Sequence, residues 1–275
     1  MRGLGPSDMA TSLPCALAIG GLDPGGGAGV VADLRAFAAA GVFGCAVVAL
    51  LTVQSTGGLL GARPVPARQV TAQVREVMHN QRVRAVKVGA LGSRENVRAI
   101  ARLLAGVRAP VIVDTPIAPT RGRARLLTSR ALSAIREELL PRATLATVNL
   151  AEAQALLGER VGTVGEAHDA ARMLTRTGAR AVLVKGGHMG GPSAIDVLAV
   201  DGEVVELRAR RLALPPIHGS GCTLASLVAG RLARLDDPRL DRNALVAAIR
   251  WAKRVHHAAL ARAVDVGRGM RVLVF

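Results

Sequence analysis

The sequence is poor in aromatic residues and in cysteine. Its 275 residues include three phenylalanines, one tryptophan and no tyrosine, which disfavours aromatic-rich all-β folds and RNA-binding modules that stack bases on aromatic rings. The three cysteines, Cys15, Cys45 and Cys222, show no C-x-x-C spacing, so neither a zinc site nor a disulfide framework is expected. Half of the residues are apolar, and a large core must therefore consist mainly of Ala, Val, Leu and Ile.

Lysine is rare as well, although the chain is strongly basic. The sequence holds 36 Lys and Arg against 20 Asp and Glu, a net charge of +16, and lysine occurs only at positions 87, 185 and 253. The arginines are scattered along predicted helices instead of forming one patch, which disfavours specific nucleic-acid binding. The basic field is still expected to attract phosphorylated small molecules.

Long apolar runs are missing too. No stretch of 18 apolar residues is free of charge, and the first dozen residues contain no continuous hydrophobic segment. Neither a membrane span nor a secretory signal peptide is therefore expected. We expect a cytoplasmic protein that makes no membrane contact, with residues 1–13 as a flexible N-terminal extension.

Short apolar runs alternate with longer segments of helical period. The runs typical of strands buried on both faces are residues 15–21, 45–53, 84–90, 110–115, 144–150 and 180–187. Helical segments lie between them or follow them at 28–41, 67–80, 93–106, 128–141, 165–178, 221–235 and 241–264. This order predicts βαβ units, and hence a three-layer α/β/α fold around a mostly parallel central sheet.

The pattern changes after residue 190. Asp201 and Gly202 join two strand-like runs, which is a strong hairpin signal and predicts an antiparallel edge near 194–208. No repeat of fixed period, low-complexity linker or domain boundary interrupts the chain. We therefore expect a single domain over residues 1–275.

A glycine-rich stretch follows the first predicted strand, where ligands bind in sheets of this kind. Residues 20–29 read GGLDPGGGAG and precede a predicted helix, but they lack the Gly-Lys-Ser/Thr of a P-loop. Two interpretations stay open: an ordinary strand-to-helix turn, or a ligand-binding loop on which Asp23 accepts hydrogen bonds from a polar ligand.

Isolated charged residues follow three later strands. Asp114 and Glu152 together offer oxygen ligands for a Mg²⁺ ion carried in by a nucleotide, and Lys185 offers a cation for a phosphate. Each acid has a plain alternative as a helix cap, and Lys185 as a surface lysine.

The segment HGSGC, residues 218–222, opens a predicted helix. The backbone N–H groups of residues 219–222 should converge with the positive end of the helix dipole and form an anion-binding site. Cys222 is either a small buried side chain or a thiol of lowered pKa that takes a proton from an alcohol attacking a phosphoryl group. His218 fits a hydrogen-bonded turn residue better than a catalyst.

In this order, these segments resemble the hydroxymethylpyrimidine/phosphomethylpyrimidine kinases of thiamine biosynthesis, a branch of the ribokinase-like superfamily. The resemblance covers nearly the whole chain and is sharpest in the DPGGGAG loop with the following ADL, in LVKGGH and in HGSGCT. It implies a ribokinase-like fold, a homodimer, and ATP and Mg²⁺ as cofactors. The implied reaction phosphorylates 4-amino-5-hydroxymethyl-2-methylpyrimidine and then its monophosphate.

The resemblance also implies site residues. Those for the pyrimidine alcohol are Gly21, Asp23, Gln54 and Ala90. Those around ATP are Asp114, Asn149, Glu152 and Lys185, of which Asp114 and Glu152 would also bind the metal ion. Those for the anion hole and catalysis are Gly219, Ser220, Gly221 and Cys222.

Several positions depart from the family pattern. Ala90 stands where the family has a methionine that packs on the pyrimidine, and Thr120 where a phosphate-covering lysine is usual, so Arg121 or Arg123 is the candidate for that charge. These changes leave two alternatives beside the pyrimidine kinase: a pyridoxal-like vitamin kinase, and a ligand-binding pseudokinase without turnover.

Overall fold

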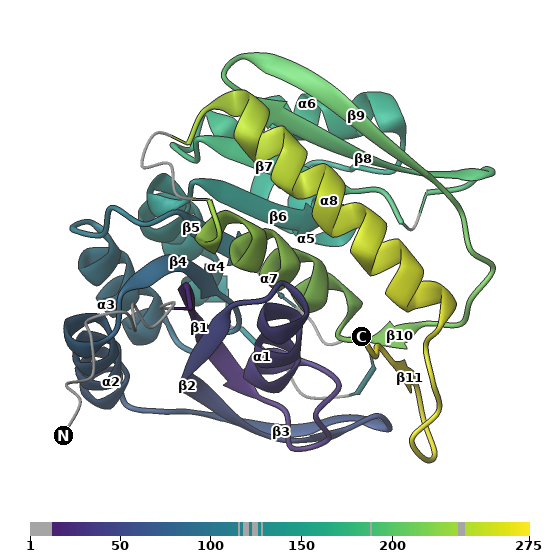
Figure 1. Ribbon diagram of the computed structural model, residues 1–275. Coiled ribbons are helices and arrows are strands. Elements are labelled where there is room, and N and C mark those ends of the chain that lie inside the picture. The colour runs from purple at the N-terminus through teal and green to yellow at the C-terminus, as the bar shows by residue number, and fades with distance from the viewer. Residues whose placement is uncertain are drawn as a thin grey trace, which may run out of the picture.

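A nine-stranded sheet runs through the centre of the computed structural model, in the order β3-β2-β1-β4-β5-β6-β7-β8-β9 (Figure 1). The structure describes residues 13–114, 116–117, 121–122, 126–127, 129–187, 189–235 and 240–275. The strands are β1 (Cys15–Leu22), β2 (Phe43–Ser55), β3 (Gly58–Pro64), β4 (Val83–Val88), β5 (Val111–Asp114), β6 (Leu145–Asn149), β7 (Ala181–Lys185), β8 (Ser193–Val200) and β9 (Glu203–Arg210). The six inner strands pair in parallel, and the pairs β2–β3, β7–β8 and β8–β9 are antiparallel.

Helices cover both faces of this sheet. They are α1 (Gly29–Ala39), α2 (Ala67–Asn80), α3 (Arg94–Leu104), α4 (Ser129–Ala134), α5 (Leu150–Leu157), α6 (Val164–Thr175), α7 (Ser220–Ala233) and α8 (Arg242–Ala261), and α4 continues into a π turn and a 3₁₀ turn at Ile135–Leu139 and Leu140–Arg142. Helices α1, α7 and α8 share one core with Ala16 and Ala18 of β1, whereas α2 to α6 share the other with Leu17 and Ile19. The alternation of side chains along a strand therefore feeds two cores, one on each face.

The three-layer fold and the antiparallel hairpin predicted near 194–208 are confirmed, because β8 and β9 pair from Ser193 with Arg210 to Val200 with Glu203. Asp201 and Gly202 form the turn, both at positive φ. Among the described residues, no helix combines the length and the apolarity needed to cross a membrane.

Several elements were not expected from the sequence, among them β3 and α5. Strand β2 runs to Ser55, two residues beyond the run 45–53 predicted for it, and the chain turns back at 56–57 into β3, which no predicted strand covers. β3 gives the sheet a second antiparallel edge. Helix α5 follows β6 directly and begins with a capping box between Asn149 and Glu152.

The C-terminal segment closes one end of the sheet. The short strands β10 (Ile217–His218) and β11 (Arg271–Val272) pair in parallel, outside the main sheet. The N–H of Met270 donates to the carbonyl of Thr56, and the Thr56 hydroxyl donates to the carbonyl of Arg268. The chain end thus ties the β2–β3 hairpin to the segment that leads into α7.

Candidate active site

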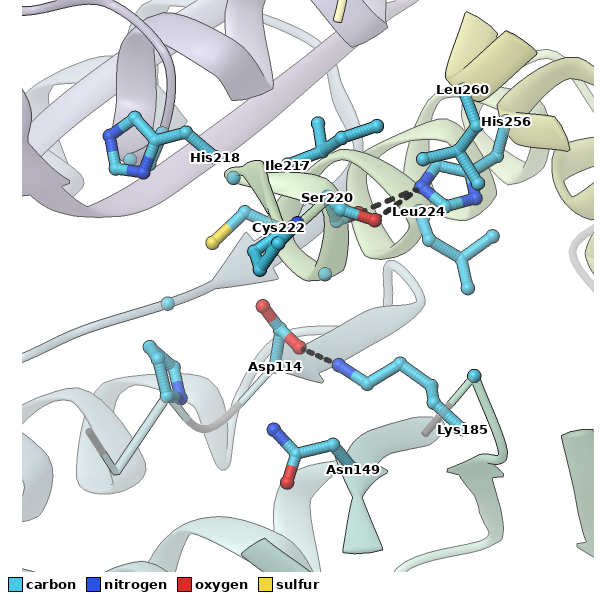
Figure 2. A pocket seen from close by; sticks show the side chains of 18 of the residues that line it. Asp114, Asn149, Lys185, Ile217, His218, Ser220, Cys222, Leu224, His256 and Leu260 are labelled. Atoms are coloured by element: carbon cyan, nitrogen blue, oxygen red, sulfur yellow. Dashed lines mark hydrogen bonds and ion pairs between the residues drawn. The ribbon is translucent and has the colours of Figure 1, made fainter. Parts of the chain in front are cut away.

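A pocket of about 480 Å³ lies at the carboxyl ends of the parallel strands. It collects twelve of the residues that the sequence singled out, from segments scattered over the whole chain (Figure 2). These are Gly21, Asp23, Gln54, Ala90, Asp114, Asn149, Glu152, Lys185, Gly219, Ser220, Gly221 and Cys222.

Two glycine-rich turns interlock at one wall of the pocket. Gly219 has a φ of +71°, and a Cβ atom there would lie 2.0 Å from the carbonyl oxygen of Gly27. A Cβ atom on Gly27 would in turn lie 2.2 Å from the His218 ring. Only glycine permits both the left-handed backbone and this close approach, which sets the N-terminus of α7 against the loop after β1.

Asp23 holds this loop in shape. One of its carboxylate oxygens accepts the N–H of Gly25, and the other accepts the N–H of Ala28 and lies 2.7 Å from His218 Nε2. Burial alone would raise the pKa of Asp23, but the hydrogen bond and charge of His218, together with the two backbone N–H groups, lower it below its ordinary value. Asp23 is fully buried, so most of its hydrogen-bonding capacity serves the protein itself.

Gln54, Gly21 and Ala90 form the wall nearest to Asp23. The Gln54 amide nitrogen lies 3.4 Å from His218 Nε2, and a Cβ atom on Gly21 would lie 3.7 Å from the Ala90 methyl group. Both Gln54 and Ala90 are half-buried. This wall pairs one amide group with small apolar surface, which suits a polar, flat ring.

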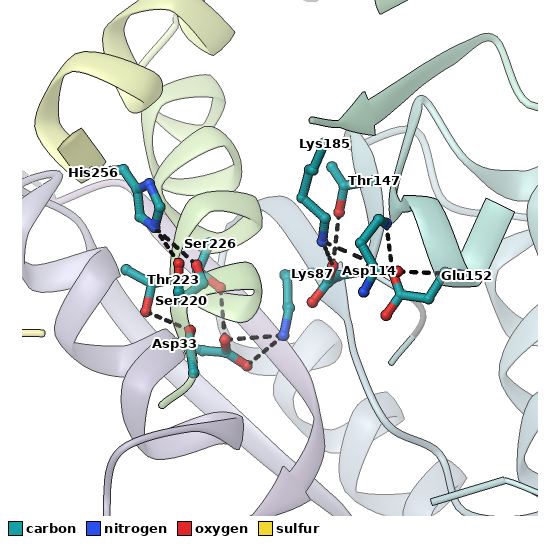
Figure 3. A network of polar contacts seen from close by, with 12 residues as sticks. Asp33, Lys87, Asp114, Thr147, Glu152, Lys185, Ser220, Thr223, Ser226 and His256 are labelled. Carbon is teal, nitrogen blue, oxygen red and sulfur yellow. Dashed lines mark hydrogen bonds and ion pairs between the residues drawn. The ribbon is translucent and has the colours of Figure 1, made fainter. Parts of the chain in front are cut away.

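The opposite side of the pocket carries a cluster of charges. Lys185 at the end of β7 lies 2.9 Å from Asp114 Oδ1 and 4.0 Å from Glu152 Oε2, and Thr147 donates to Asp114 at 2.8 Å (Figure 3). Burial opposes ionisation of Asp114, but Lys185 and Lys87 outweigh it and lower the pKa of Asp114. Asp114 and Lys185 therefore form a buried ion pair.

Glu152 differs from Asp114 in that its pKa is raised and not lowered. Its carboxylate accepts the N–H of Asn149, while the Asn149 side chain accepts the N–H of Glu152. Burial raises the pKa of Glu152 to about 7, and the charge of Lys185 offsets that effect only in part. The cap interpretation of Glu152 is confirmed, and the cap places both side chains on the pocket wall, while the binding interpretation stays a prediction.

No described group of three or more His, Cys, Asp and Glu side chains is arranged to hold a metal ion by itself. Asp114 and Glu152 supply at most two carboxylates, which matches the way proteins hold Mg²⁺ together with nucleotide phosphates and water. The carboxylates present therefore fit a nucleotide-borne Mg²⁺ ion.

Cys222 lies in the first turn of α7, half-buried at the pocket wall and facing the side that carries Asp114 (Figure 2). Of the two interpretations of Cys222, the thiol of lowered pKa is wrong. Burial dominates and raises the pKa of the Cys222 thiol to about 12, although Lys87 and Lys185 act in the opposite direction. The resting thiol is therefore protonated at neutral pH.

Sequence reasoning missed the buried ion pair of Lys87 and Asp33. Lys87 Nζ lies 2.9 and 3.0 Å from the two Asp33 oxygens, and the Ser226 hydroxyl donates to Asp33 at 2.7 Å (Figure 3). The signal was available: a lysine inside the strand run RAVKVGA and an aspartate inside the apolar helix AGVVADLRAF. Because a buried charge needs a partner, a lysine and an aspartate at two buried positions predict an ion pair between them.

His256 of α8 was missed as well. Its Nε2 atom lies 3.0 Å from both the hydroxyl and the carbonyl oxygen of Ser220, at the start of α7. Burial lowers the pKa of His256 to about 4, so the ring is neutral near pH 7. No sequence motif distinguishes His256, because its partner lies 36 residues away.

Of the predicted phosphate-covering residues, the structure describes Arg121 alone, and Arg121 does not join the described pocket wall. Arg121 is exposed, and its carbonyl accepts the N–H of Leu59 at 3.0 Å, so its segment runs beside β3. Thr120 and Arg123 lie outside the described residues.

Comparison with known proteins gives consistent matches over nearly the whole chain. A family model described as phosphomethylpyrimidine kinase matches residues 23–273. A hydroxymethylpyrimidine/phosphomethylpyrimidine kinase of Streptomyces coelicolor is 40% identical over 257 residues, which cover 94% of this chain and 92% of that protein. A protein of the same name from Rhizobium meliloti is also 40% identical over 257 residues, covering 92% and 94%.

Solved structures share the fold. An ADP complex of Bacillus subtilis pyridoxal kinase matches with a TM-score of 0.84 and 27% identity, over 95% of this chain and 97% of that one. A phosphomethylpyrimidine kinase from Clostridium difficile matches with a TM-score of 0.74 and 27% identity, over 89% and 98%.

Proposed function

Because this chain belongs to the phosphomethylpyrimidine kinase family, we propose that it phosphorylates 4-amino-5-hydroxymethyl-2-methylpyrimidine with ATP, and then phosphorylates the resulting monophosphate. The observation that carries this proposal is the convergence of two unlike walls on one pocket. The glycine-framed start of α7 with Cys222 faces a buried lysine–carboxylate cluster at the ends of β5 to β7.

The anion-binding end of α7 is suited to the transferring phosphoryl group. The first N–H groups of a helix have no partner inside the helix, and the helix dipole adds partial positive charge at the same place. Gly219 fixes where these groups point, and a Cβ atom on Gly221 would lie only 3.2 Å from Lys185 Nζ. Backbone donors and the Lys185 ammonium can therefore reach the same phosphate.

Asp114, Asn149, Glu152 and Lys185 form the proposed nucleotide side, and Asp114 and Glu152 would hold Mg²⁺. The ion would offset the negative charge of the phosphates, which is its usual part in phosphoryl transfer. Lys185, kept charged by Asp114, contributes a fixed cation beside them.

Gly21, Asp23, Gln54 and Ala90 form the proposed alcohol side. Gln54 offers a hydrogen-bonding amide to the ring, while Asp23 and His218 keep the glycine loop in place. Cys222 lies between the two sides, where a thiolate could accept the proton of the hydroxymethyl group as its oxygen attacks the γ-phosphorus.

Release of ADP, measured with the pyrimidine alcohol and separately with its monophosphate, tests the activity. Turnover of both supports the proposal, and no release above the blank with either would overturn it. Tight pyrimidine binding by calorimetry without turnover would instead identify a pseudokinase.

The likeness to pyridoxal kinase favours pyridoxal as the second candidate alcohol. The 40% identity to pyrimidine kinases outweighs it, against 27% for the pyridoxal kinase. A kcat/KM for pyridoxal above that for the pyrimidine would reverse this order.

The proposal extends to a single domain that works as a homodimer. The family model spans residues 23–273, which supports one domain. Leu51, Val53 and Leu60 expose apolar side chains on the β2–β3 hairpin, a surface that a second copy could cover. Sedimentation equilibrium distinguishes dimer from monomer.

A further inference from the structure

A fully buried salt bridge lies under the start of α7 and has no part in the roles assigned so far. Lys87 of β4 and Asp33 of α1 are both almost completely inaccessible, yet both border the pocket. Their strand and helix positions place the pair on the α1–α7 side of the sheet, since the neighbouring Ala85 belongs to the core on that side.

Helical spacing connects this pair to Cys222. Ser226 follows Cys222 by four residues in α7, so the two side chains lie on the same face of the helix, one turn apart. The Ser226 hydroxyl donates to Asp33 at 2.7 Å. The face of α7 that carries Cys222 is therefore the face that rests on the Asp33–Lys87 pair, and Figure 3 shows Ser226 of this face beside the pair.

The position of the Lys87 ammonium is fixed from several sides. Asp33 accepts two hydrogen bonds from it, and a Cβ atom on Gly89 would lie 2.9 Å from Nζ. Ion pairs removed from water are weak contributors to stability, because the loss of hydration offsets the attraction. Fold stability therefore does not explain why a lysine is buried here. Burial does strengthen the electrostatic effect of a fixed cation on a reactive group beside it.

Four charged side chains from four elements act electrostatically on the Cys222 thiol. They are Asp33 of α1, Lys87 of β4, Asp114 of β5 and Lys185 of β7. Lys87 affects the thiol more strongly than any of the other three, and it favours the thiolate. Lys185 already has a proposed role at the nucleotide phosphates, whereas Lys87 has none.

We propose that Lys87 is a positioning residue for phosphoryl transfer: held by Asp33, which Ser226 supports, its ammonium stabilises negative charge on the Cys222 sulfur. The Cys222 thiol is protonated at rest, so it must first give its proton to solvent, and the thiolate then takes the proton of the hydroxymethyl group. The alcohol oxygen bonds to the γ-phosphorus, the bond from that phosphorus to the bridging oxygen breaks, and ADP leaves with the electron pair. This role rests on the proposed function of Cys222, but its electrostatic part can be measured without turnover.

The test is the rate at which iodoacetamide alkylates Cys222, followed by mass spectrometry of the peptide that contains it. The full-length protein is used without nucleotide or metal, at about pH 9. Because only the thiolate reacts, the rate follows the thiolate fraction, and one pH unit in its midpoint changes the rate about tenfold.

The two partners of the pair give opposite expectations. Lys87→Met should slow alkylation about tenfold, whereas Asp33→Asn, which leaves the ammonium unopposed, should accelerate it. Unchanged alkylation rates, or rates that change in the same direction in both variants, would overturn the proposal. If the pair had only a structural role, losing either partner would change the alkylation rate in the same direction.

Lys87→Met alone leaves the buried Asp33 carboxylate without its cation, and this variant can fail to fold. The double variant Lys87→Met/Asp33→Asn removes both charges and should still react more slowly than the parent, since Lys87 has the larger effect on the thiol. Equal rates in the double variant and the parent would contradict the role of Lys87.

Lys253→Met is the matched control, because Lys253 also borders the pocket and is also paired with an aspartate, Asp196 of β8. It should leave the alkylation rate of Cys222 unchanged. Slowing as large as in Lys87→Met would mean that any pocket cation has this effect, and would overturn the assignment to Lys87. A kinase assay that fails while the alkylation pattern holds would count against the proposed function and not against this electrostatic role.

Discussion

Each lysine of the chain has the same kind of partner. Lys87, Lys185 and Lys253 all border the pocket and pair with Asp33, Asp114 and Asp196 respectively. A buried ammonium without a carboxylate would lose its proton or destabilise the fold, so each pair is required as soon as the lysine is placed inside. The pocket wall thereby holds three ammonium groups, each fixed beside its own carboxylate.

At the scale of single residues, Cys222→Ala tests the thiol itself. Loss of a general base typically lowers the rate by about 10²-fold or more, so kcat should fall while the dissociation constant of ATP stays near that of the parent. Steady-state kinetics and calorimetry measure the two quantities. Cys45→Ala is the control, since Cys45 lies on β2 beside Cys15, outside the described pocket wall. An unchanged kcat in Cys222→Ala would return this cysteine to a packing role.

Gly219 and Gly221 should respond differently to a single methyl group. Gly219→Ala forces a left-handed residue and an overlap with the Gly27 carbonyl, and should lower the free energy of unfolding by at least about 2 kcal/mol. In Gly221→Ala the nearest atom is the flexible Lys185 ammonium, so stability should hold while the KM for ATP rises. Urea unfolding of both variants, with kinetics on Gly221→Ala, checks this. Equal loss of stability would contradict the interlocked arrangement of the two turns.

At the scale of secondary-structure elements, His256 couples α8 to the start of α7 and makes their contact sensitive to acid. Its pKa is about 4 in the folded protein and near 6.5 in the unfolded chain. Below about pH 6.5 the unfolded chain binds the proton first, so stability that is fully present above that pH is lost as the pH falls toward 4. The loss amounts to at most about 3 kcal/mol.

His256→Gln removes this titration. The free energy of unfolding, measured in urea between about pH 7.5 and pH 4.5, should fall less steeply in the variant than in the parent. Other groups titrate in both proteins, so the difference between the two curves isolates His256. Parallel curves would show that the ring is not buried in its neutral form.

The order of elements could be predicted from the sequence because buried parallel strands and amphipathic helices carry strong patterns. Strand β3 was not predicted, because GLLGARP lacks β-branched residues and does not alternate apolar with polar residues. Its pairing with β2 decides its conformation. β10 and β11 are two residues long and exist only through their mutual contact. For the site, strand ends and glycine turns located most residues, but Lys87, Asp33 and His256 depend on contacts between distant segments.

The pKa of Cys222 shows where local reasoning fails. A helix start favours a thiolate, and that part of the argument needs only the sequence. Burial acts in the opposite direction and prevails, and the depth of a side chain depends on every element packed around it. The sequence was therefore enough to predict that Cys222 lies at the pocket, but not to predict the protonation state of its thiol.

At the scale of the whole molecule, the net charge of +16 should act on charged substrates. Raising the salt concentration from about 50 mM to about 500 mM NaCl screens the field of the protein. With ATP saturating, the KM for the pyrimidine monophosphate should rise several-fold, while the KM for the uncharged alcohol stays nearly constant. Equal salt dependence for the two substrates would remove long-range charge as the explanation.

The burial of the lysines also decides how the protein can be handled chemically. Their side chains are only 1%, 14% and 12% exposed at positions 87, 185 and 253, while the many surface cations are arginines, which acylating reagents do not modify. Amine-directed dyes and cross-linkers therefore find no exposed lysine to attach to, and any lysine that does react lies in the pocket wall. Slow acylation of a lysine side chain, as distinct from the N-terminal amine, that is blocked by a bound ligand would report on access to the pocket.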